Sequence, residues 1–179
     1  MMLGNLDGSR LPSERASAPL QEEVVVSLQG CEALQGEWRW LWTRCPGAPP
    51  SLRPEGLLPW YQRHVPPDPL WVLTLRSEGR LVGLAPLAIR NENGARVVRL
   101  LGEGPADVLM DPELAPRGAS HLFDWLARHR DRWDTCVFEP LPEDALLLRT
   151  PAPPGWGERL ESLGTSHRRS LWLAPVETM

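Results

Sequence analysis

The stretch that decides the fold runs from residue 70 to residue 101 and reads LWVLTLRSEGRLVGLAPLAIRNENGARVVRLL. Its first part (70–76) and its second part (80–89) are rich in β-branched and aliphatic residues, and a short turn that contains Gly79 separates them. This pattern is typical of a β-hairpin, in which glycine supplies the positive φ that the turn needs. A second turn precedes residues 95–101, which we expect to be a third strand. The sequence therefore predicts an antiparallel meander in the middle of the chain.

Pro86 lies late in the second of these predicted strands. Proline has no N–H to donate to a neighbouring strand, so within sheets it is found mainly at edges and at bulges. We therefore expect Pro86 to mark either an edge position or a bulge in the meander.

Helical patterns lie on both sides of the predicted meander. Apolar residues recur at helical spacing within residues 31–45 and again within residues 118–131, which predicts two amphipathic helices. A shorter helix is expected over 57–65, with Pro59 in its first turn, where proline is tolerated. Further elements are expected as strands over 24–28, 106–110, 134–139 and 170–176 and as a helix over 156–163. Antiparallel strands flanked by helices define the mixed α+β class.

The composition excludes several classes of protein. The chain has 179 residues and a formal net charge of −4, so it lacks the basic excess that nucleic-acid binding requires. All 19 basic residues are arginine, which excludes a lysine Schiff base and a phosphate-loop lysine. The three cysteines show no C-x-x-C spacing, so neither a disulfide framework nor a zinc ribbon is expected.

The chain is expected to form one domain after a short tail. Residues 1–21 mix small, polar and charged types without periodicity and predict a disordered tail, whereas residues 22–179 predict a single domain. The longest uncharged apolar run, 81–89, has nine residues, and a membrane-spanning helix needs about 20. The first residues do not read as a secretory signal, so a cytoplasmic location is expected.

Residues 99–104 read RLLGEG and match the short pattern Arg-x-x-Gly-x-Gly of an acyl-CoA pyrophosphate loop. In such a loop, successive backbone N–H groups and a following helix N-terminus bind the phosphates. The candidate cofactor-binding residues are Arg99, Gly102 and Gly104. Pro105 follows the motif at once, and Glu103 would face the phosphates. A second match, at 80–85, falls inside a predicted hairpin strand and is interpreted as coincidence.

Two carboxylates follow this motif. Asp107 and Asp111 bracket three apolar residues, and strand alternation would place both side chains on one face. Paired carboxylates can act as a base or orient an amine. They can equally be a turn residue and a loop residue before a helix, and the pattern favours this structural role. His121 and His129 share a predicted helix with several arginines, which favours a solvated face, and no metal site is expected.

Six stretches occur in an order and spacing that resemble a known family. They read EWRWLWTR (37–44), PEGLLPWY (54–61), RLVGLAPL (80–87), RLLGEGPAD (99–107), DPELAP (111–116) and LPED (141–144). Their arrangement is similar to the amino-terminal half of bacterial GNAT-superfamily acetyltransferases of the cellulose-biosynthesis (CelD/BcsL-like) type, relatives of the FemAB aminoacyl transferases. The resemblance covers roughly residues 24–145.

This resemblance implies a GNAT-like fold, in which helices flank an antiparallel-rich central sheet. It also implies transfer of an acyl group from acetyl-CoA to an amine or hydroxyl of a small molecule, glycan or peptide, with a link to polysaccharide or cell-envelope biosynthesis. The acceptor would attack the thioester directly, assisted by a base and by backbone donors at a splayed strand. The candidate bases are Asp107 and Glu103, and the candidate substrate contacts are Trp60 and Asp111.

The sequence departs from the family pattern at two places. Residues 51–56 read SLRPEG where the family often has FQSPEW, and residues 106–108 read ADV where it often has SDY. Proteins of this type usually carry two tandem GNAT-like units with the acetyl-CoA loop in the second, and this chain ends near where a second unit would begin. A second hypothesis is therefore a non-catalytic GNAT-like half, an interaction or substrate-groove module that pairs with a second half or with itself.

Overall fold

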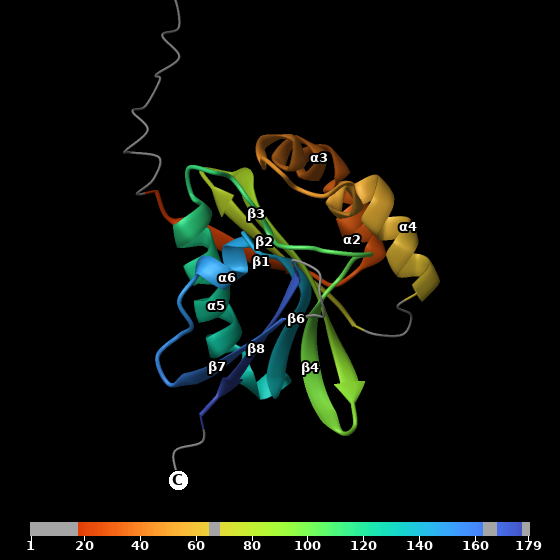
Figure 1. Cartoon of the computed structure of the whole chain (residues 1–179). Helices are drawn as coiled ribbons and strands as arrows, with labels where there is room; N and C mark the ends of the chain where they lie inside the picture. Colours follow the sequence, from red (N-terminus) through yellow and green to blue (C-terminus); the bar gives the residue numbers. More distant parts are fainter. Residues whose placement is uncertain (1–17, 65–68, 163–167, 177–179) are drawn as a thin grey trace, which may run out of the picture.

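A computed structural model describes residues 18–64, 69–162 and 168–176, so most of the predicted 1–21 tail lies outside the described residues. The strands and helices, in chain order, are β1 (Leu20–Val25), α2 (Leu28–Ala33), α3 (Gln35–Arg44), η1 (Pro50–Leu52), α4 (Pro54–His64), β2 (Leu70–Ser77), β3 (Arg80–Glu92), β4 (Ala95–Leu100), β5 (Leu109–Met110), α5 (Ala115–Arg128), η2 (Arg130–Arg132), β6 (Thr135–Pro142), α6 (Leu146–Arg149), β7 (Trp156–Ser162) and β8 (Arg168–Pro175) (Figure 1). Within the described ranges, no helix combines the length and the apolar character that crossing a bilayer requires.

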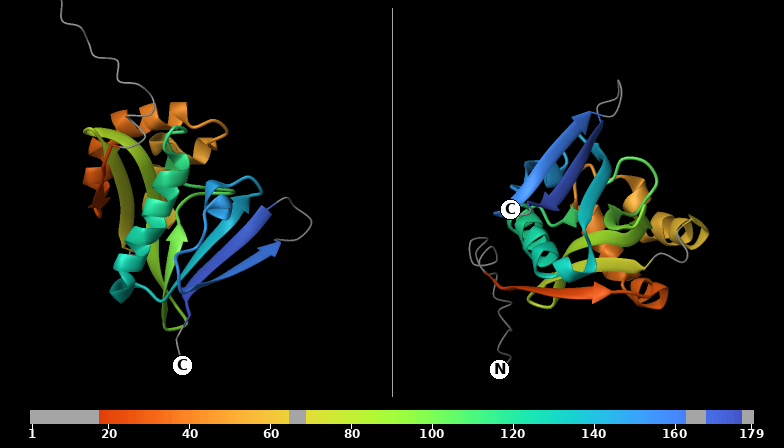
Figure 2. Two further views of the ribbon diagram at one scale, coloured as in Figure 1. Left: turned by 90° about the vertical axis from the view of Figure 1, so that its left-hand side faces the viewer. Right: turned by 90° about the horizontal axis from the view of Figure 1, so that it is seen from below.

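The strands form one mixed sheet in the order β1-β2-β3-β4-β6-β8-β7, and β5 pairs with β3 beside this path. Every pairing is antiparallel except the one between β4 and β6. Helix α5 covers one face of the sheet, and α2, α3 and α4 cover the other (Figures 1 and 2). This arrangement confirms the α+β class with an antiparallel-rich sheet between helices.

Each face of the sheet has its own apolar core. The core on the α5 side contains Trp71, Leu73, Leu87, Val98, Phe123 and Phe138, all almost fully buried. The core on the α3 side contains Trp38, Leu41, Leu57, Val72, Leu84 and Leu109, which are also almost fully buried. Side chains alternate between the two faces along β2 and β3, so both strands are buried throughout their middle parts.

The predicted hairpin is confirmed, with β2 paired over its whole length with residues 80–88 of β3. The turn between them uses two residues with positive φ, Glu78 at 51° and Gly79 at 78°, the conformation that matches the twist of paired strands. The predicted third strand is confirmed as β4, antiparallel to β3.

Pro86 lies inside β3, opposite Val72, so it is neither in an edge strand nor at the register shift of the hairpin, which falls between Leu75 and Arg76. Its carbonyl accepts a hydrogen bond from Leu101 N at 2.8 Å, so the carbonyl and the ring nitrogen of Pro86 face the side of β3 on which β4 lies. The missing N–H of Pro86 therefore faces the place where the chain leaves the sheet after β4. The proline thus lies beside a gap in the neighbouring strand, where a donor is not needed.

Three predicted elements differ from the structure at the N-terminal side. The strand predicted at 24–28 is β1, which ends at Val25, because the hydroxyl of Ser27 accepts a hydrogen bond from Gly30 N at 3.1 Å and caps α2. The helix predicted over 31–45 is divided into α2 and α3 at Leu34. Helix α4 begins at Pro54, so Pro59 lies in its interior and not in its first turn, a correction to the sequence-based prediction.

The helix predicted over 156–163 is wrong, because residues 156–162 form strand β7, paired antiparallel with β8, and residue 163 lies outside the described residues. Its apolar residues at 156 and 160 are four positions apart, a spacing that fits both the helical and the strand period. Local pattern therefore could not decide, and pairing with β8 determines the conformation.

Candidate functional site

The sheet opens where the strand next to β3 is interrupted. Strand β4 runs parallel to β6 from Val97 to Arg99, and the chain then leaves the sheet after Leu100. It returns as β5, which pairs with Gly83 and Leu84 of β3. Among the described strands, β5 has no partner on its other side. The gap between β5 and the end of β6 is therefore the place where a ligand can reach the backbone of the sheet.

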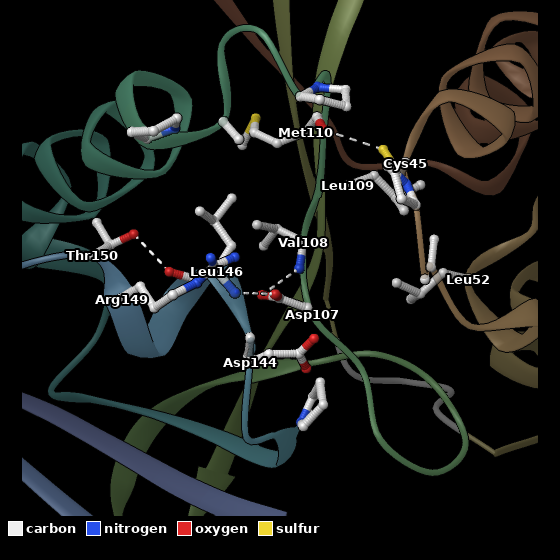
Figure 3. A pocket seen from close by; sticks show the side chains of 18 of the residues that line it. Cys45, Leu52, Asp107, Val108, Leu109, Met110, Asp144, Leu146, Arg149 and Thr150 are labelled. Atoms are coloured by element: carbon white, nitrogen blue, oxygen red, sulfur yellow. Dashed lines mark hydrogen bonds between the residues drawn. The ribbon is translucent and has the colours of Figure 1, made fainter.

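A cavity of about 570 Å³ lies at this gap (Figure 3). Its lining comes from residues 45–49 and Leu52 on the α3 side, from residues 107–110, from the start of α5, and from the stretch 142–151 that contains α6. The first of these segments belongs to the helical layer on one face of the sheet, and α5 lies on the other. The cavity thus extends along the open edge of β5 from one layer to the other.

The backbone of Met110 faces this cavity. Asp111 N donates to Val82 O at 2.8 Å, so in the alternation of an antiparallel pair the neighbouring Met110 directs its N–H and C=O away from β3. The Met110 carbonyl indeed accepts a hydrogen bond from Cys45 Sγ at 3.3 Å. Burial raises the pKa of the Cys45 thiol to about 11, so it stays protonated and serves as a donor. The Met110 N–H is left directed toward the cavity.

The carboxylate of Asp107 holds the N-terminus of α6. It accepts hydrogen bonds from Val108 N at 2.9 Å, from Leu147 N at 3.4 Å and from Leu146 N (Figure 3). Ala145, the N-cap residue of α6, has no side chain that could do this. Burial raises the pKa of Asp107, although these backbone donors act in the opposite direction. Asp107 lies in the cavity wall as expected for a base, but its oxygens are engaged in these bonds.

Asp111 does not line the cavity and instead closes the turn between β5 and α5. Its carboxylate is 1% exposed and pairs with Arg44, with Nε to Oδ2 at 2.8 Å and a guanidinium nitrogen to Oδ1 at 3.3 Å. It also accepts Glu113 N at 3.2 Å, and its backbone carbonyl accepts Leu114 N at 2.9 Å. Burial alone would raise the pKa of Asp111, but the hydrogen bond and charge of Arg44 hold it below its ordinary value.

This turn offers few donors to a phosphate. Two of its N–H groups are used by Asp111, and Pro112 and Pro116 have none. Helix α5 begins without a side-chain cap, and no arginine follows β5 until Arg117. The turn before α5 therefore offers few backbone donors to the diphosphate of acetyl-CoA, the donor that the sequence resemblance implies.

Arg149, the last residue of α6, is the cation of the cavity wall. It is exposed, and within the described part of the chain it forms no ion pair. Both side chains lie in the cavity wall, and the charge of Arg149 partly offsets the increase that burial causes in the pKa of Asp107. Arg149 is therefore the side chain best placed to meet an anionic group at the cavity mouth. Within the described residues, no group of three His, Cys, Asp or Glu side chains could hold a metal ion.

The remaining predicted site residues lie outside the cavity lining. Arg99 is held on β4 by Glu92 at 2.7 Å and by Glu139 at 2.6 Å. The motif around it continues into the excursion that separates β4 from β5, and not into a helix N-terminus. Its glycines have positive φ, 140° at Gly102 and 77° at Gly104.

The last two candidates are also apart from the cavity. Glu103 is exposed in the same excursion. Trp60 is half-buried in α4 and stacks on His64 with ring centroids 5.3 Å apart. Sequence reasoning did not find Met110, Cys45 or Arg149, because their role depends on long-range contacts. The one signal for them is the interrupted strand pattern that Pro86 and residues 101–108 leave in the sequence.

Comparison with known proteins shows the fold. No family model and no curated protein matches the chain. The structure is similar to the ribosomal-protein-S18-alanine N-acetyltransferase from Escherichia coli, at 12% identity over 90% of this chain and 96% of that one, with a TM-score of 0.52. It is similar to an acetyltransferase from Thermus thermophilus, at 12% identity over 87% of this chain and 97% of that one, with a TM-score of 0.53.

A third similar structure is a tandem GNAT protein from the clavulanic acid biosynthesis pathway, at 20% identity and a TM-score of 0.46. The match covers 82% of this chain but only 38% of the tandem protein. The two single-unit structures define the class: the described chain has the GNAT fold, as the sequence resemblance implied.

Proposed function

We propose that the protein is an acyltransferase that moves an acyl group from a CoA thioester to an amine or hydroxyl acceptor. The observation that carries this proposal is the Met110 N–H, which the free edge of β5 directs into a cavity reaching both helical layers. A fixed backbone donor in such a place can stabilise the negative charge that develops on a thioester oxygen. The GNAT fold of the chain supports the same reaction class.

The acceptor would attack the thioester carbon directly, and the CoA thiolate would leave. Asp107 is the half-buried carboxyl of the cavity wall, and burial raises its pKa, the direction that makes a carboxylate a better general base. Its two oxygens accept three backbone hydrogen bonds, and a carboxylate has about four acceptor sites, so one site of Oδ2 remains for the proton of the acceptor. Arg149 would meet a phosphate of CoA at the cavity mouth. The other sequence-based candidates remain predictions, and they are Glu103, Arg99, Gly102, Gly104, Trp60 and Asp111.

A specific observation favours a second candidate function, a non-catalytic GNAT-like module. The turn after β5 is closed around Asp111 and Arg44 and offers few backbone donors to a diphosphate. In this case the cavity would shape a groove for a partner unit, and a second GNAT-like half or self-association would complete the site. The cellulose-biosynthesis type, the link to the cell envelope and the cytoplasmic location rest on the sequence alone and remain predictions.

Calorimetric titration of acetyl-CoA into the purified chain distinguishes the two functions. We expect saturable binding that Arg149→Glu weakens at least tenfold, because a charge-assisted contact to a phosphate becomes a repulsion. Arg63→Glu is the matched control: it makes the same charge change on an exposed arginine of α4 outside the cavity. An absence of binding by the wild type would favour the module, and equal losses in both variants would exclude Arg149 from the site.

A further inference from the structure

The two sides of the cavity differ in chemistry. The side formed by α5 and α6 carries Ser120, Arg149 and Thr150. The opposite side, here named the apolar wall, consists of Cys45, Pro46, Gly47, Ala48, Pro49 and Leu52. The apolar wall contains no charged residue, and its side chains are aliphatic or cyclic apart from one thiol. A ligand lying across β5 would therefore have a polar end at Arg149 and an apolar end at Ala48 and Leu52.

Two backbone carbonyls and the thiol of the apolar wall are already paired inside the protein. Trp38 Nε1 donates to Leu52 O at 2.9 Å, and Trp42 Nε1 donates to Pro49 O at 3.0 Å. The Cys45 thiol donates to Met110 O. These bonds hold the wall in place and use these polar groups. An amine or sugar acceptor placed there would find few partners to replace its bonds to water, whereas a hydrocarbon chain needs none.

We propose that the apolar wall binds the acyl chain of the donor, and that the preferred donor carries a chain longer than acetyl. The inference rests on the proposed function, because it takes the thioester to lie at the Met110 N–H. From this point the pantetheine arm extends toward Arg149, and the acyl chain extends toward Ala48 and Leu52. A cavity of about 570 Å³ is within the range that encloses sizeable small-molecule ligands, and it leaves room for such a chain.

The test is a chain-length series measured by calorimetry. Acetyl-, butyryl- and octanoyl-CoA are titrated into the wild-type chain, together with S-acetyl- and S-octanoyl-pantetheine, which lack the nucleotide. Each buried methylene is expected to tighten binding about fourfold, so butyryl-CoA should bind on the order of tenfold more tightly than acetyl-CoA. Equal affinities for the acetyl and octanoyl compounds would overturn the inference.

Two phenylalanine variants locate the chain within the cavity. Ala48→Phe fills the apolar wall and should remove the dependence on chain length. Ser120→Phe places the same side chain at the opposite end and should weaken all thioesters alike, with the dependence kept. Circular dichroism and thermal unfolding verify that each variant folds, and Ala48→Leu replaces Ala48→Phe if the larger side chain prevents folding. A chain-length dependence that survives a folded Ala48 variant would overturn the proposal.

The same series separates this inference from the proposed function. If the pantetheine thioesters show the dependence but no CoA thioester binds, the acyl site stands and the CoA-dependent function fails. If acetyl-CoA binds and is turned over as well as octanoyl-CoA, the function stands and the long-chain site fails.

Discussion

Strands β4 and β5 occupy the same side of β3 and differ in what lies beyond them. β4 is hydrogen-bonded on both sides, to β3 and to β6, and its Arg99 is fixed by two glutamates. β5 is only two residues long, pairs with β3 alone, and turns its other edge toward a cavity. The comparison teaches that the candidate site lies where strand pairing on one side of the sheet ends, at the unpaired edge of β5. A backbone donor becomes available to a ligand where the sheet stops using it.

The largest effect is expected from detaching β5 from β3. Met110 is 6% exposed and fits between two glycines, since a Cβ added at Gly83 or at Gly118 would lie 2.5 Å from its Sδ. Met110→Ala should lower the free energy of unfolding by about 3 kcal/mol, because it leaves a cavity against both glycines. Urea unfolding followed by tryptophan fluorescence measures this loss.

A double-mutant cycle tests whether the packing of Met110 against Gly83 causes this loss of stability. Gly83→Ala alone should destabilise, because the new methyl meets Met110 Sδ and lies 3.1 Å from Leu75 Cβ. In the Met110→Ala background the contact with sulfur is gone, so the same substitution should cost less, with a coupling energy of at least about 0.5 kcal/mol. Strictly additive losses would show that β5 is not held by this interlock.

A smaller effect is expected from opening the turn that follows β5. Asp111→Ala removes a buried carboxylate that holds Arg44 and the N–H of Glu113, and should cost about 2 kcal/mol. The matched change at the other strand is Asp134→Ala, which breaks an exposed pair with Arg96 at the start of β4. That change should have a small effect, because solvent screens exposed pairs. If the two variants lost equal free energy of unfolding in urea, this would contradict the expected difference between the buried Asp111–Arg44 pair and the exposed Asp134–Arg96 pair.

The sequence predicts those elements whose structure depends on neighbouring residues, and it does not predict those that depend on contacts between residues far apart in the chain. The hairpin of β2 and β3, strand β4 and helix α5 are local patterns, and all were predictable. β7 was not, because Trp156 and its following residues fit two periods and only β8 decides between them. The pairing of Asp107 with α6 joins residues 39 and 40 positions apart, so no local motif announces it.

The cavity itself is the least predictable part of the structure. Its essential feature is an edge without a partner, and the sequence marks that edge only by the interrupted strand pattern of Pro86 and residues 101–108. The alternation of Asp107 and Asp111 suggested two carboxylates on one face, whereas one caps α6 and the other closes the turn with Arg44. Both have the structural role that the sequence pattern favoured, and Asp107 also reaches the cavity wall.

The smallest expected effect distinguishes these two carboxylates by pH. The folded state holds the proton of Asp107 more tightly than the unfolded chain does, because burial raises its pKa above 3.8. Its contribution to the free energy of unfolding is therefore greatest below pH 3.8 and falls as pH rises toward the folded pKa. For Asp111, whose folded pKa is lowered from 3.8, the contribution is present above that pH and is lost as pH falls toward the lower value.

Asp107→Asn and Asp111→Asn should consequently change the pH dependence of unfolding in opposite directions. Relative to the wild type, the stability of Asp107→Asn should improve as pH rises from 3.8, since the unfavourable ionisation of a half-buried carboxyl is gone. The stability of Asp111→Asn should approach that of the wild type as pH falls below 3.8, since the wild type then loses its charge on Asp111. Urea unfolding of the three proteins between about pH 3 and pH 7 measures both trends. Parallel curves for the two variants would mean that the folded state does not hold the proton of Asp107 more tightly than the unfolded chain does.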